Sequence, residues 1–298
     1  MAKELERRKL GNTGMTPCIL SLGCAWFGSD KSSDEDTVKG VRRAIELGMD
    51  FVDTSAGYGQ SERRIGLALE GGWRDKIYLE TKVGTHPEHR GDYSAKTTRW
   101  SVENSLRQLK TEYLDSVLIH DPEDIEVPLA PGACLDELVK IKAEGLIGHI
   151  GLGCRRHDFH RRAIETGEIE IILTYLDYTL LDQSVAQTTL PLARARGVGI
   201  IMASVFGMGL LGGREPNPQA GRNRPKAYIA QAMWQWCKDR EVNIQHLAMQ
   251  FCMAADFEGI VMPGPYNVEK VEEAHAAATA EVPPEIWSDF KAEFGVGL

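Results

Sequence analysis

The chain has 298 residues, enough for one large domain or two ordinary ones. Its formal net charge is −9 and its Lys and Arg residues are scattered, which argues against nucleic acid as a main partner because phosphate binding needs clustered positive charge. No apolar stretch approaches the roughly 18–20 residues of a membrane-spanning helix, and the charged start lacks the apolar core of a signal peptide. We therefore expect a cytoplasmic protein.

Short β-branched runs alternate with longer amphipathic stretches along the whole chain. The runs lie at 19–23, 51–55, 77–83, 116–121, 149–154, 169–175, 199–204 and 259–264. Between them, segments such as 34–48 and 94–110 carry apolar residues three and four positions apart, which predicts helices. Runs that are apolar on both faces suit a parallel sheet covered by helices. Eight such units predict a single (β/α)8 barrel domain over residues 1–298, with an open doubly wound sheet as the alternative.

Two segments fall outside this repeat. The segment 5–19 has turn residues between short runs, which predicts a small β-hairpin before the first barrel strand. The segment 206–226 is a long loop rich in Gly, Pro and Asn after the seventh strand. Loops of this length in compact domains are usually functional, and this one would lie on the catalytic face of the barrel.

The sequence predicts no metal site. The six cysteines show no metal-ligand spacing and are interpreted as reduced thiols, mostly in the core. His86 and His89 lie three residues apart, as do His157 and His160, but neither pair has a third ligand beside it.

Four ionisable side chains occur where apolar runs stop. Asp53 lies within the second run and Tyr58 lies just past its end. Lys82 lies at the end of the third run. His120 lies at the end of the fourth. Because the ends of parallel barrel strands converge on one face, we expect these side chains to meet there and to form a proton-transfer site, which indicates an enzyme. Taken singly, each has an ordinary interpretation as a loop aromatic, an ion pair or a buried histidine.

With these residues in place, the chain resembles the aldo-keto reductase superfamily nearly from end to end. The resemblance rests on RRKLGNTGMTP at the start, then DTSAGYG, ETKVG and VLIHDP, and later ASVFGMGLL and MPGPYNVEKVEEA. It implies that hydride moves between a nicotinamide ring and a carbon bearing oxygen, while a proton moves through Tyr58.

The chemistry of the four residues agrees with this implied reaction. A free tyrosine has a pKa of about 10, and a cation within about 4–6 Å lowers such a pKa. Lys82 is the predicted cation, and Asp53 would pair with it and fix its direction. His120 would hydrogen-bond the substrate oxygen and orient the carbonyl. The cofactor supplies the hydride, so the chemistry needs no metal.

The sequence GMGLLG at 207–212 matches G-x-G-x-x-G, but a dinucleotide fingerprint must open a helix, and the Gly- and Pro-rich residues that follow predict none. We therefore reject a Rossmann interpretation. In the resembled family this loop lies over the cofactor pyrophosphate. The implied cofactor contacts here are Ser204, Gly207, Gly209 and Leu210. Arg214, Arg222 and Arg224 could add positive charge, although a solvated loop explains them equally.

The segment MPGPYNVEKVEEA corresponds to the part of the family that holds the adenosine end of the cofactor, which implies contacts at Gly264, Asn267 and Glu273. Reductases that use NADPH usually carry Lys or Arg just after this Pro-Gly, where Pro265 and Tyr266 stand here. Without that cation the charge-assisted bond to the 2′-phosphate is lost. NAD is therefore the predicted cofactor, with NADP as the alternative.

Two departures from the family pattern affect the nicotinamide. Gly153-Cys154 stands where many members carry Ser-Asn, and Tyr175 stands where many carry Gln. We do not transfer those amide contacts to this chain. Tyr175 is predicted to stack on the nicotinamide face, with a core position as the alternative.

The sequences LTYLDYTLLD and GVGIIMAS, with the NAD-type tail, are most similar to the aldose dehydrogenases of the superfamily, those for L-galactose, L-fucose, D-threo-aldoses and related sugars. The implied reaction oxidises the C1 hydroxyl of a sugar ring to a lactone, with the Tyr58 phenolate as base. Trp26, Phe27 and Trp100 are predicted to form pocket walls, since sugars often lie on aromatic faces. Core packing is the alternative for each.

Three other functions stay open at this point. One is an NADPH-dependent aldehyde or ketone reductase, and another is a regulatory or structural subunit that holds cofactor with little turnover. The third is a barrel enzyme that forms a Schiff base on Lys82. The expected partner is a small-molecule substrate, with neither nucleic acid nor membrane, and the sequence predicts no oligomeric state.

Overall fold

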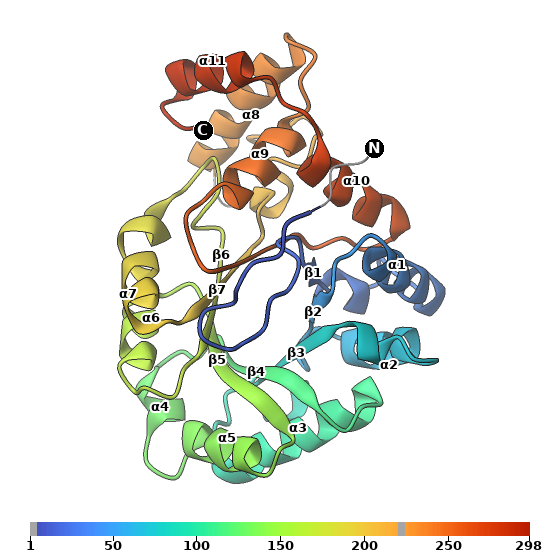
Figure 1. The fold of residues 1–298 in the computed structure, drawn as a ribbon, viewed down its shortest axis with the longest axis vertical. Helices are drawn as coiled ribbons and strands as arrows, with labels where there is room; N and C mark the ends of the chain where they lie inside the picture. The colour runs from blue at the N-terminus through green and yellow to red at the C-terminus, as the bar shows by residue number, and fades with distance from the viewer. Residues whose placement is uncertain (1–4, 220–223) are drawn as a thin grey trace.

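The computed structural model describes residues 5–219 and 224–298, and its centre is a barrel of eight parallel strands (Figure 1). Neighbouring strands follow chain order around the ring. The ring closes where the Val261 amide donates to the Ile19 carbonyl at 2.8 Å and the Ser21 amide donates to the Val261 carbonyl at 2.9 Å. The predicted (β/α)8 barrel is confirmed.

Each strand overlaps the apolar run predicted for it. The strands are β1 (Leu22–Gly23), β2 (Phe51–Asp53), β3 (Tyr78–Val83), β4 (Leu114–His120), β5 (Ile147–Gly153), β6 (Ile171–Tyr175), β7 (Gly199–Ala203) and β8 (Gly259–Met262). Helices cover the outside and side chains fill the inside, so both faces of the strands are buried. This double burial explains why the runs do not alternate between apolar and polar residues.

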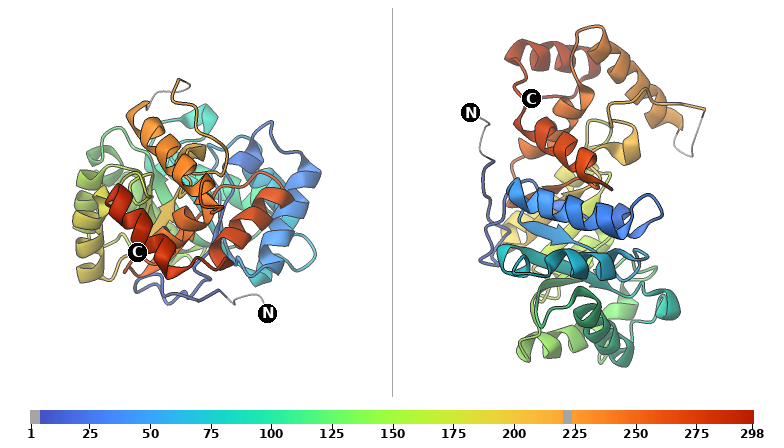
Figure 2. Two further views of the ribbon diagram at one scale, coloured as in Figure 1. Left: turned by 90° about the horizontal axis from the view of Figure 1, so that it is seen from above. Right: turned by 90° about the vertical axis from the view of Figure 1, so that its right-hand side faces the viewer.

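The helices lie around the barrel and at one end of the molecule. They are α1 (Asp34–Glu46), α2 (Ser61–Leu69), α3 (Ala95–Leu109), α4 (Glu126–Leu129), α5 (Cys134–Ala143), α6 (His157–Ile164), α7 (Thr189–Arg196), α8 (Arg224–Lys238), α9 (Ile244–Met253), α10 (Val268–Thr279) and α11 (Pro284–Phe294). Short 3-10 helices are η1 (Trp26–Gly28), η2 (Arg74–Lys76), η3 (Pro87–His89), η4 (Ser184–Gln187) and η5 (Gly207–Gly209). Figures 1 and 2 show α8, α9 and α11 gathered together. None of the described helices combines the length and the apolar character needed to cross a membrane.

Capping residues set the helix starts that the sequence indicates. Ser33 precedes α1 and forms a capping box, in which its hydroxyl accepts from the Asp36 amide and the Asp36 carboxylate accepts from the Ser33 amide. Ser94 accepts from the Thr97 amide at the start of α3. These caps satisfy amides that would otherwise lack partners.

A turn before β1 closes the end of the barrel opposite the carboxyl ends of the strands. The Leu10 amide donates to the Met15 carbonyl at 3.1 Å, in the antiparallel arrangement that the sequence predicts. Both side chains join the cluster inside the barrel. Gly11 has φ +54°, and a Cβ there would lie 2.3 Å from the Gly199 nitrogen, so this position requires glycine. The Arg8 guanidinium ties the turn to the segment before β8 through the carbonyls of Met253, at 2.7 Å, and Ala255, at 3.1 Å.

The loop after β7 follows the prediction of a long irregular segment. After Ser204 it forms the short η5, in which Met208 has φ 55°, and then continues without helix or strand through the described residues up to 219. The sequence GMGLLG therefore does not open a long helix, as the rejection of a Rossmann fingerprint requires.

We predict that Leu10→Ala lowers the free energy of unfolding by about 2–5 kcal/mol, because Leu10 is fully buried in the barrel interior and its loss leaves a cavity. The turnover rate should stay close to that of the wild type, since this residue lies at the end away from the catalytic face. Denaturant unfolding measures the change, with half-buried Leu5→Ala as the control that should cost less. A loss below about 1 kcal/mol for Leu10→Ala would contradict its role as a plug.

Candidate active site

The structure brings Asp53, Tyr58, Lys82 and His120 together at the carboxyl ends of β2, β3 and β4. The Lys82 ammonium is fully buried, donates to the Asp53 carboxylate, and also donates to the Thr54 carbonyl at 2.8 Å. Its Nζ lies 4.8 Å from the centre of the Tyr58 ring. The Tyr58 hydroxyl lies 3.4 Å from Nε2 of His120. A lysine has three N–H donors, so one remains for the tyrosine.

Local backbone contacts hold Tyr58 over the barrel. Its amide donates to the Ser55 carbonyl at 3.0 Å, which closes a turn directly after β2. Gly28 of η1 lies against the same turn, since a Cβ on Gly28 would fall 1.6 Å from the Tyr58 carbonyl oxygen. The Gln60 amide also donates to the Gly28 carbonyl, at 3.1 Å. The position of the phenol is therefore set by the loop after β1 as well as by its own turn.

His120 is held as a neutral imidazole. Its Nδ1 lies 2.9 Å from the Thr85 hydroxyl and 3.1 Å from the Ser55 hydroxyl. Burial lowers the pKa of His120 well below its usual value, and the charge of Lys82 lowers it further. If the hydroxyls donate to Nδ1, the proton sits on Nε2, which faces the Tyr58 hydroxyl. The carboxylate of Asp121, 3.5 Å from Nε2, favours this tautomer.

Opposing effects act on the ionisation of Tyr58 and Lys82. Burial raises the pKa of the Tyr58 phenol, and the charge of Lys82 acts against that rise. Burial alone would lower the pKa of Lys82, but the charges of Asp53 and Tyr58 outweigh it and raise this pKa above its usual value. Lys82 therefore stays charged, and its charge partly offsets the effect of burial on the Tyr58 phenol.

Asp121 is a site residue that the sequence analysis missed. It follows β4 with φ 41°, a conformation that costs energy in a non-glycine residue and is concentrated at functional sites. Its carboxylate is 44% exposed and accepts from the Tyr175 hydroxyl at 3.2 Å. The signal was present in the sequence, since Asp121 directly follows His120 at a strand end. Tyr175 thus lies beside His120 and Asp121, and its stacking on the nicotinamide stays a prediction.

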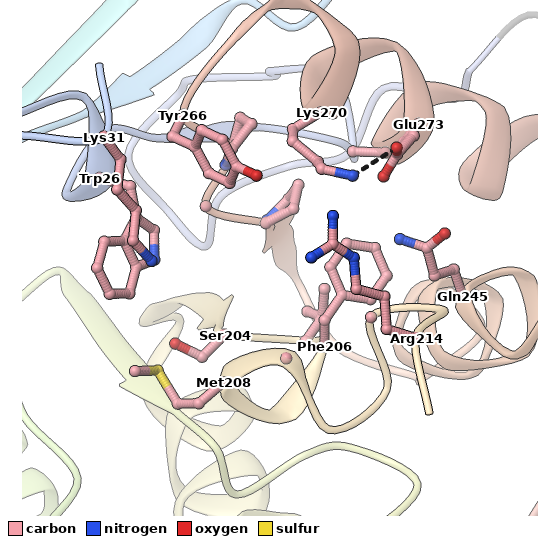
Figure 3. A pocket seen from close by; sticks show the side chains of 17 residues that line it. Trp26, Lys31, Ser204, Phe206, Met208, Arg214, Gln245, Tyr266, Lys270 and Glu273 are labelled. Atoms are coloured by element: carbon pink, nitrogen blue, oxygen red, sulfur yellow. Dashed lines mark hydrogen bonds and ion pairs between the residues drawn. The ribbon is translucent and has the colours of Figure 1, made fainter. Parts of the chain in front are cut away.

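A cavity of about 290 Å³ opens between the loop after β1, the loop after β7 and the start of α10 (Figure 3). Its lining includes four predicted cofactor contacts, Ser204, Gly209, Gly264 and Glu273. Trp26, predicted for the substrate pocket, forms part of its wall. A Cβ on Gly264 would lie 3.3 Å from the Trp26 ring, so a larger residue there would crowd this wall.

Three cations line this cavity. Lys31, Arg214 and Lys270 come from three distant segments, and Figure 3 shows their side chains around the same space. The lining holds one carboxylate, Glu273, which accepts from Lys270 at 2.5 Å. The balance is positive although the chain as a whole carries −9. Such a cavity fits a molecule with a linear diphosphate, and the backbone of Gly209 allows close approach.

Other predicted residues lie elsewhere. Phe27 is fully buried and packs against Gly40 of α1, so the structure places it in the core and not on a pocket wall. Asn267 caps α10 by accepting from the Lys270 amide at 2.9 Å. Gly207 and Leu210 flank the cavity in sequence without lining it, and Trp100 lies on α3 between the rings of His86 and His89. The side chains of Arg222 and Arg224 lie outside the described residues.

The fold and the site together define a barrel protein that holds a tyrosine, a buried lysine–aspartate pair and a neutral histidine at its strand ends, close to a cation-lined cavity. The model of the aldo/keto reductase family matches residues 19–292, and the chain belongs to this family. Membership implies an enzyme that uses a nicotinamide cofactor.

Two relatives of known activity are dehydrogenases of sugars. The chain is 32% identical over 285 residues to L-galactose dehydrogenase of Arabidopsis thaliana, covering 93% of this chain and 89% of the relative. It is 28% identical over 311 residues to D-threo-aldose 1-dehydrogenase of a Pseudomonas species, covering 93% and 94%. The holo form of an aldo-keto reductase from Bacillus halodurans shares the fold, with a TM-score of 0.80, 23% identity, and 97% and 96% of the two chains covered.

His160 of α6 holds the segment after β5 without taking part in the chemistry. Its Nε2 lies 2.9 Å from the Cys154 carbonyl and its Nδ1 lies 2.8 Å from the Thr189 hydroxyl. Burial lowers the pKa of His160 to about 4. Below about pH 6.5 His160 therefore binds a proton in the unfolded chain but stays neutral in the folded chain.

We predict that replacing His160 by Gln weakens the loss of stability on acidification. Between pH 6.5 and pH 4 the buried neutral histidine should cost the wild type up to about 1.4 kcal/mol per pH unit, or about 3 kcal/mol in all, and His160→Gln should lack this contribution. Denaturant unfolding of both proteins across this range measures the difference. At pH 7.5 His160 is neutral in both the folded and the unfolded wild type. The difference in free energy of unfolding at this pH is therefore the cost of the substitution that does not depend on protonation. Parallel curves at all pH values would contradict the assignment.

Proposed function

We propose that the protein oxidises an aldose at C1 to the corresponding lactone, with NAD as the hydride acceptor and Tyr58 as the base. The observation that carries the proposal is the buried Lys82–Asp53 pair beneath the Tyr58 ring, with neutral His120 beside the phenol. The sugar dehydrogenases among the relatives support the choice of substrate class.

The four residues divide the work by their geometry. Lys82 stabilises the Tyr58 phenolate, which takes the proton of the C1 hydroxyl at its Oη atom. Nε2 of His120 lies 3.4 Å from the Tyr58 hydroxyl. Its N–H donates to the substrate oxygen and fixes the direction of that oxygen. Asp53 holds Lys82 charged and in place. A bound nicotinamide supplies hydride chemistry, which none of these side chains can perform.

Asp121 supports a polyhydroxylated substrate. Its exposed carboxylate is an acceptor-only group beside His120, and Tyr175 already donates to one of its oxygens. A sugar offers hydroxyl donors on C2 and the carbons that follow it, whereas a simple aldehyde does not. The positive φ of Asp121 fixes the direction of this carboxylate.

The Glu273–Lys270 pair supports NAD. Glu273 neutralises Lys270, which is the cation nearest in sequence to the position where a 2′-phosphate would be held. A carboxylate accepts hydrogen bonds from the free hydroxyls of a ribose and repels a phosphate. Tyr266 lines the cavity where other family members carry a cation.

One observation favours a second candidate, an NADPH-dependent aldehyde or ketone reductase. Lys31 and Arg214 line the same cavity, and the Lys31 ammonium lies over the Trp26 ring, 4.1 Å from its centre. Either cation could hold an additional phosphate. The choice between the candidates is therefore a measurement of cofactor preference.

We expect NADH to bind at least about tenfold more tightly than NADPH, because Glu273 opposes the additional 2′-phosphate by about 1.4 kcal/mol or more. Titration of tryptophan fluorescence measures both affinities, and Trp26 in the cavity wall supplies a reporter. The variant Glu273→Gln should narrow the preference by improving NADPH binding. Tighter binding of NADPH by the unmodified protein would move the reductase ahead.

We predict that Tyr58→Phe lowers the turnover of L-galactose and related aldoses by about 10²-fold or more, because it removes the proton acceptor. NADH affinity should change by less than about threefold, since the tyrosine faces the reacting oxygen. Tyr228→Phe is the matched control, because Tyr228 is exposed on α8 and should leave turnover unchanged. Retained activity in Tyr58→Phe, or loss of cofactor binding, would overturn the assignment.

A further inference from the structure

Glu80 is a buried acidic side chain inside the barrel that the proposed mechanism does not use. It lies on β3 two residues before Lys82, so both side chains point to the barrel interior. Strand register places Glu80 beside Asp53 of β2 and beside Ser116 of β4. An apolar cluster that includes Phe51 and Leu118 fills much of the interior, and Glu80 is fully buried. Such a carboxyl group needs partners.

The hydrogen bonds of Glu80 account for only one of its oxygens. The Ser116 hydroxyl donates to Oε2 at 2.6 Å. Oε1 has no donor among the described residues, and the Asp53 carboxyl is the charged group on the neighbouring strand β2 that acts on Glu80. Two adjacent carboxylates in a buried site cannot both be ionised at low cost. One proton must therefore lie between them.

The surroundings of the two carboxyls decide where this proton sits. Asp53 accepts directly from the Lys82 ammonium, which favours its charged form. Glu80 receives only a neutral hydroxyl donor, from Ser116. Burial raises the pKa of Glu80 well above its usual value, and the charge of Asp53 raises it further. A proton on Oε1 would also give that atom the hydrogen-bond partner it lacks, by donation to Asp53.

We propose that Glu80 is a positioning residue that acts as a protonated carboxylic acid, donating a hydrogen bond to Asp53 beneath the catalytic tyrosine. In this state Asp53, Glu80 and Lys82 together carry no net charge. The single positive charge of Lys82, balanced by Asp53 alone, can then stabilise a phenolate at Tyr58. The inference rests on the proposed function of Tyr58 as base for its catalytic consequence, but not for the protonation of Glu80.

An ionised Glu80 would have the opposite effect on Tyr58. The groups that face it are Asp53 from β2, Lys82 on its own strand and Ser116 from β4. Two carboxylates against one ammonium would leave a negative charge under the phenol and oppose its ionisation. Tyr58 can therefore act as a base only if Glu80 is protonated. Replacing the Glu80 carboxyl group by a neutral amide tests this directly.

The first experiment is infrared difference spectroscopy on the full-length holoenzyme at neutral pH, wild type minus Glu80→Gln. The glutamine keeps the shape, the neutral charge and a donor toward Asp53. We expect the difference spectrum to contain the carbonyl band of a protonated carboxylic acid. Loss of a carboxylate band in its place would show that Glu80 is ionised and would overturn the proposal. This readout needs no turnover, so it stands even if Tyr58→Phe disproves the proposed reaction.

The second experiment follows the pH dependence of aldose oxidation. In Glu80→Gln the midpoint of the rate increase should stay within about 0.3 pH unit of the wild type, because no charge changes. A midpoint about one unit lower or more would mean that the substitution removed a negative charge, and the proposal would be wrong. Glu62→Gln is the control, since this second buried carboxyl accepts from Thr81, whose side chain points to the opposite face of β3 from Glu80 and Lys82.

Glu80→Leu separates positioning from simple filling of space. Leucine is neutral and of similar size but cannot donate to Asp53 or accept from Ser116. We expect kcat to fall by about tenfold or more with KM little changed, whereas Glu80→Gln restores most of the activity. Equal kcat values in the leucine and glutamine variants would contradict the positioning role. The infrared result on Glu80→Gln remains decisive should the leucine variant fail to fold.

Discussion

The burial of the Lys82 ammonium is the constraint on which the rest of the site depends. An unpaired cation in the interior of a barrel is prohibitively unfavourable, so Asp53 and the Thr54 carbonyl must face it. These contacts tie β2 to β3 at the end where Tyr58 leaves the barrel. The same charge adds to the burial that keeps His120 neutral, and it also acts on the Tyr58 phenol. The Lys82 ammonium thus affects both the stability of the fold and the electrostatics of the site.

The barrel and the approach of the four ionisable side chains at its strand ends could both be predicted from the sequence, because both follow from where apolar runs begin and stop. The sequence was insufficient where a contact depends on helical phase or strand register. Trp26 and Phe27 are neighbours in η1, yet one faces the cavity and the other the core. The relation of Glu80 to Asp53 appears only when the two strands are placed in register. Asn267 carries a helix-capping signal that the family resemblance obscured.

The net charge of the chain does not predict the local charge around its cavity. The chain is acidic overall, but Lys31, Arg214 and Lys270 reach one cavity from segments that are far apart in sequence. No local motif marks such a convergence, which is why counting charges along the chain did not reveal the cation-lined cavity. A low-dielectric cleft concentrates the field of these few groups.

The turn that plugs the barrel also has a consequence for synthesis on the ribosome. Arg8 donates to the carbonyls of Met253 and Ala255, and the segment at Ile19 pairs with Val261 of the last strand. These partners emerge only when most of the chain has been translated. These contacts therefore form last, and the barrel closes only after β8 has been made.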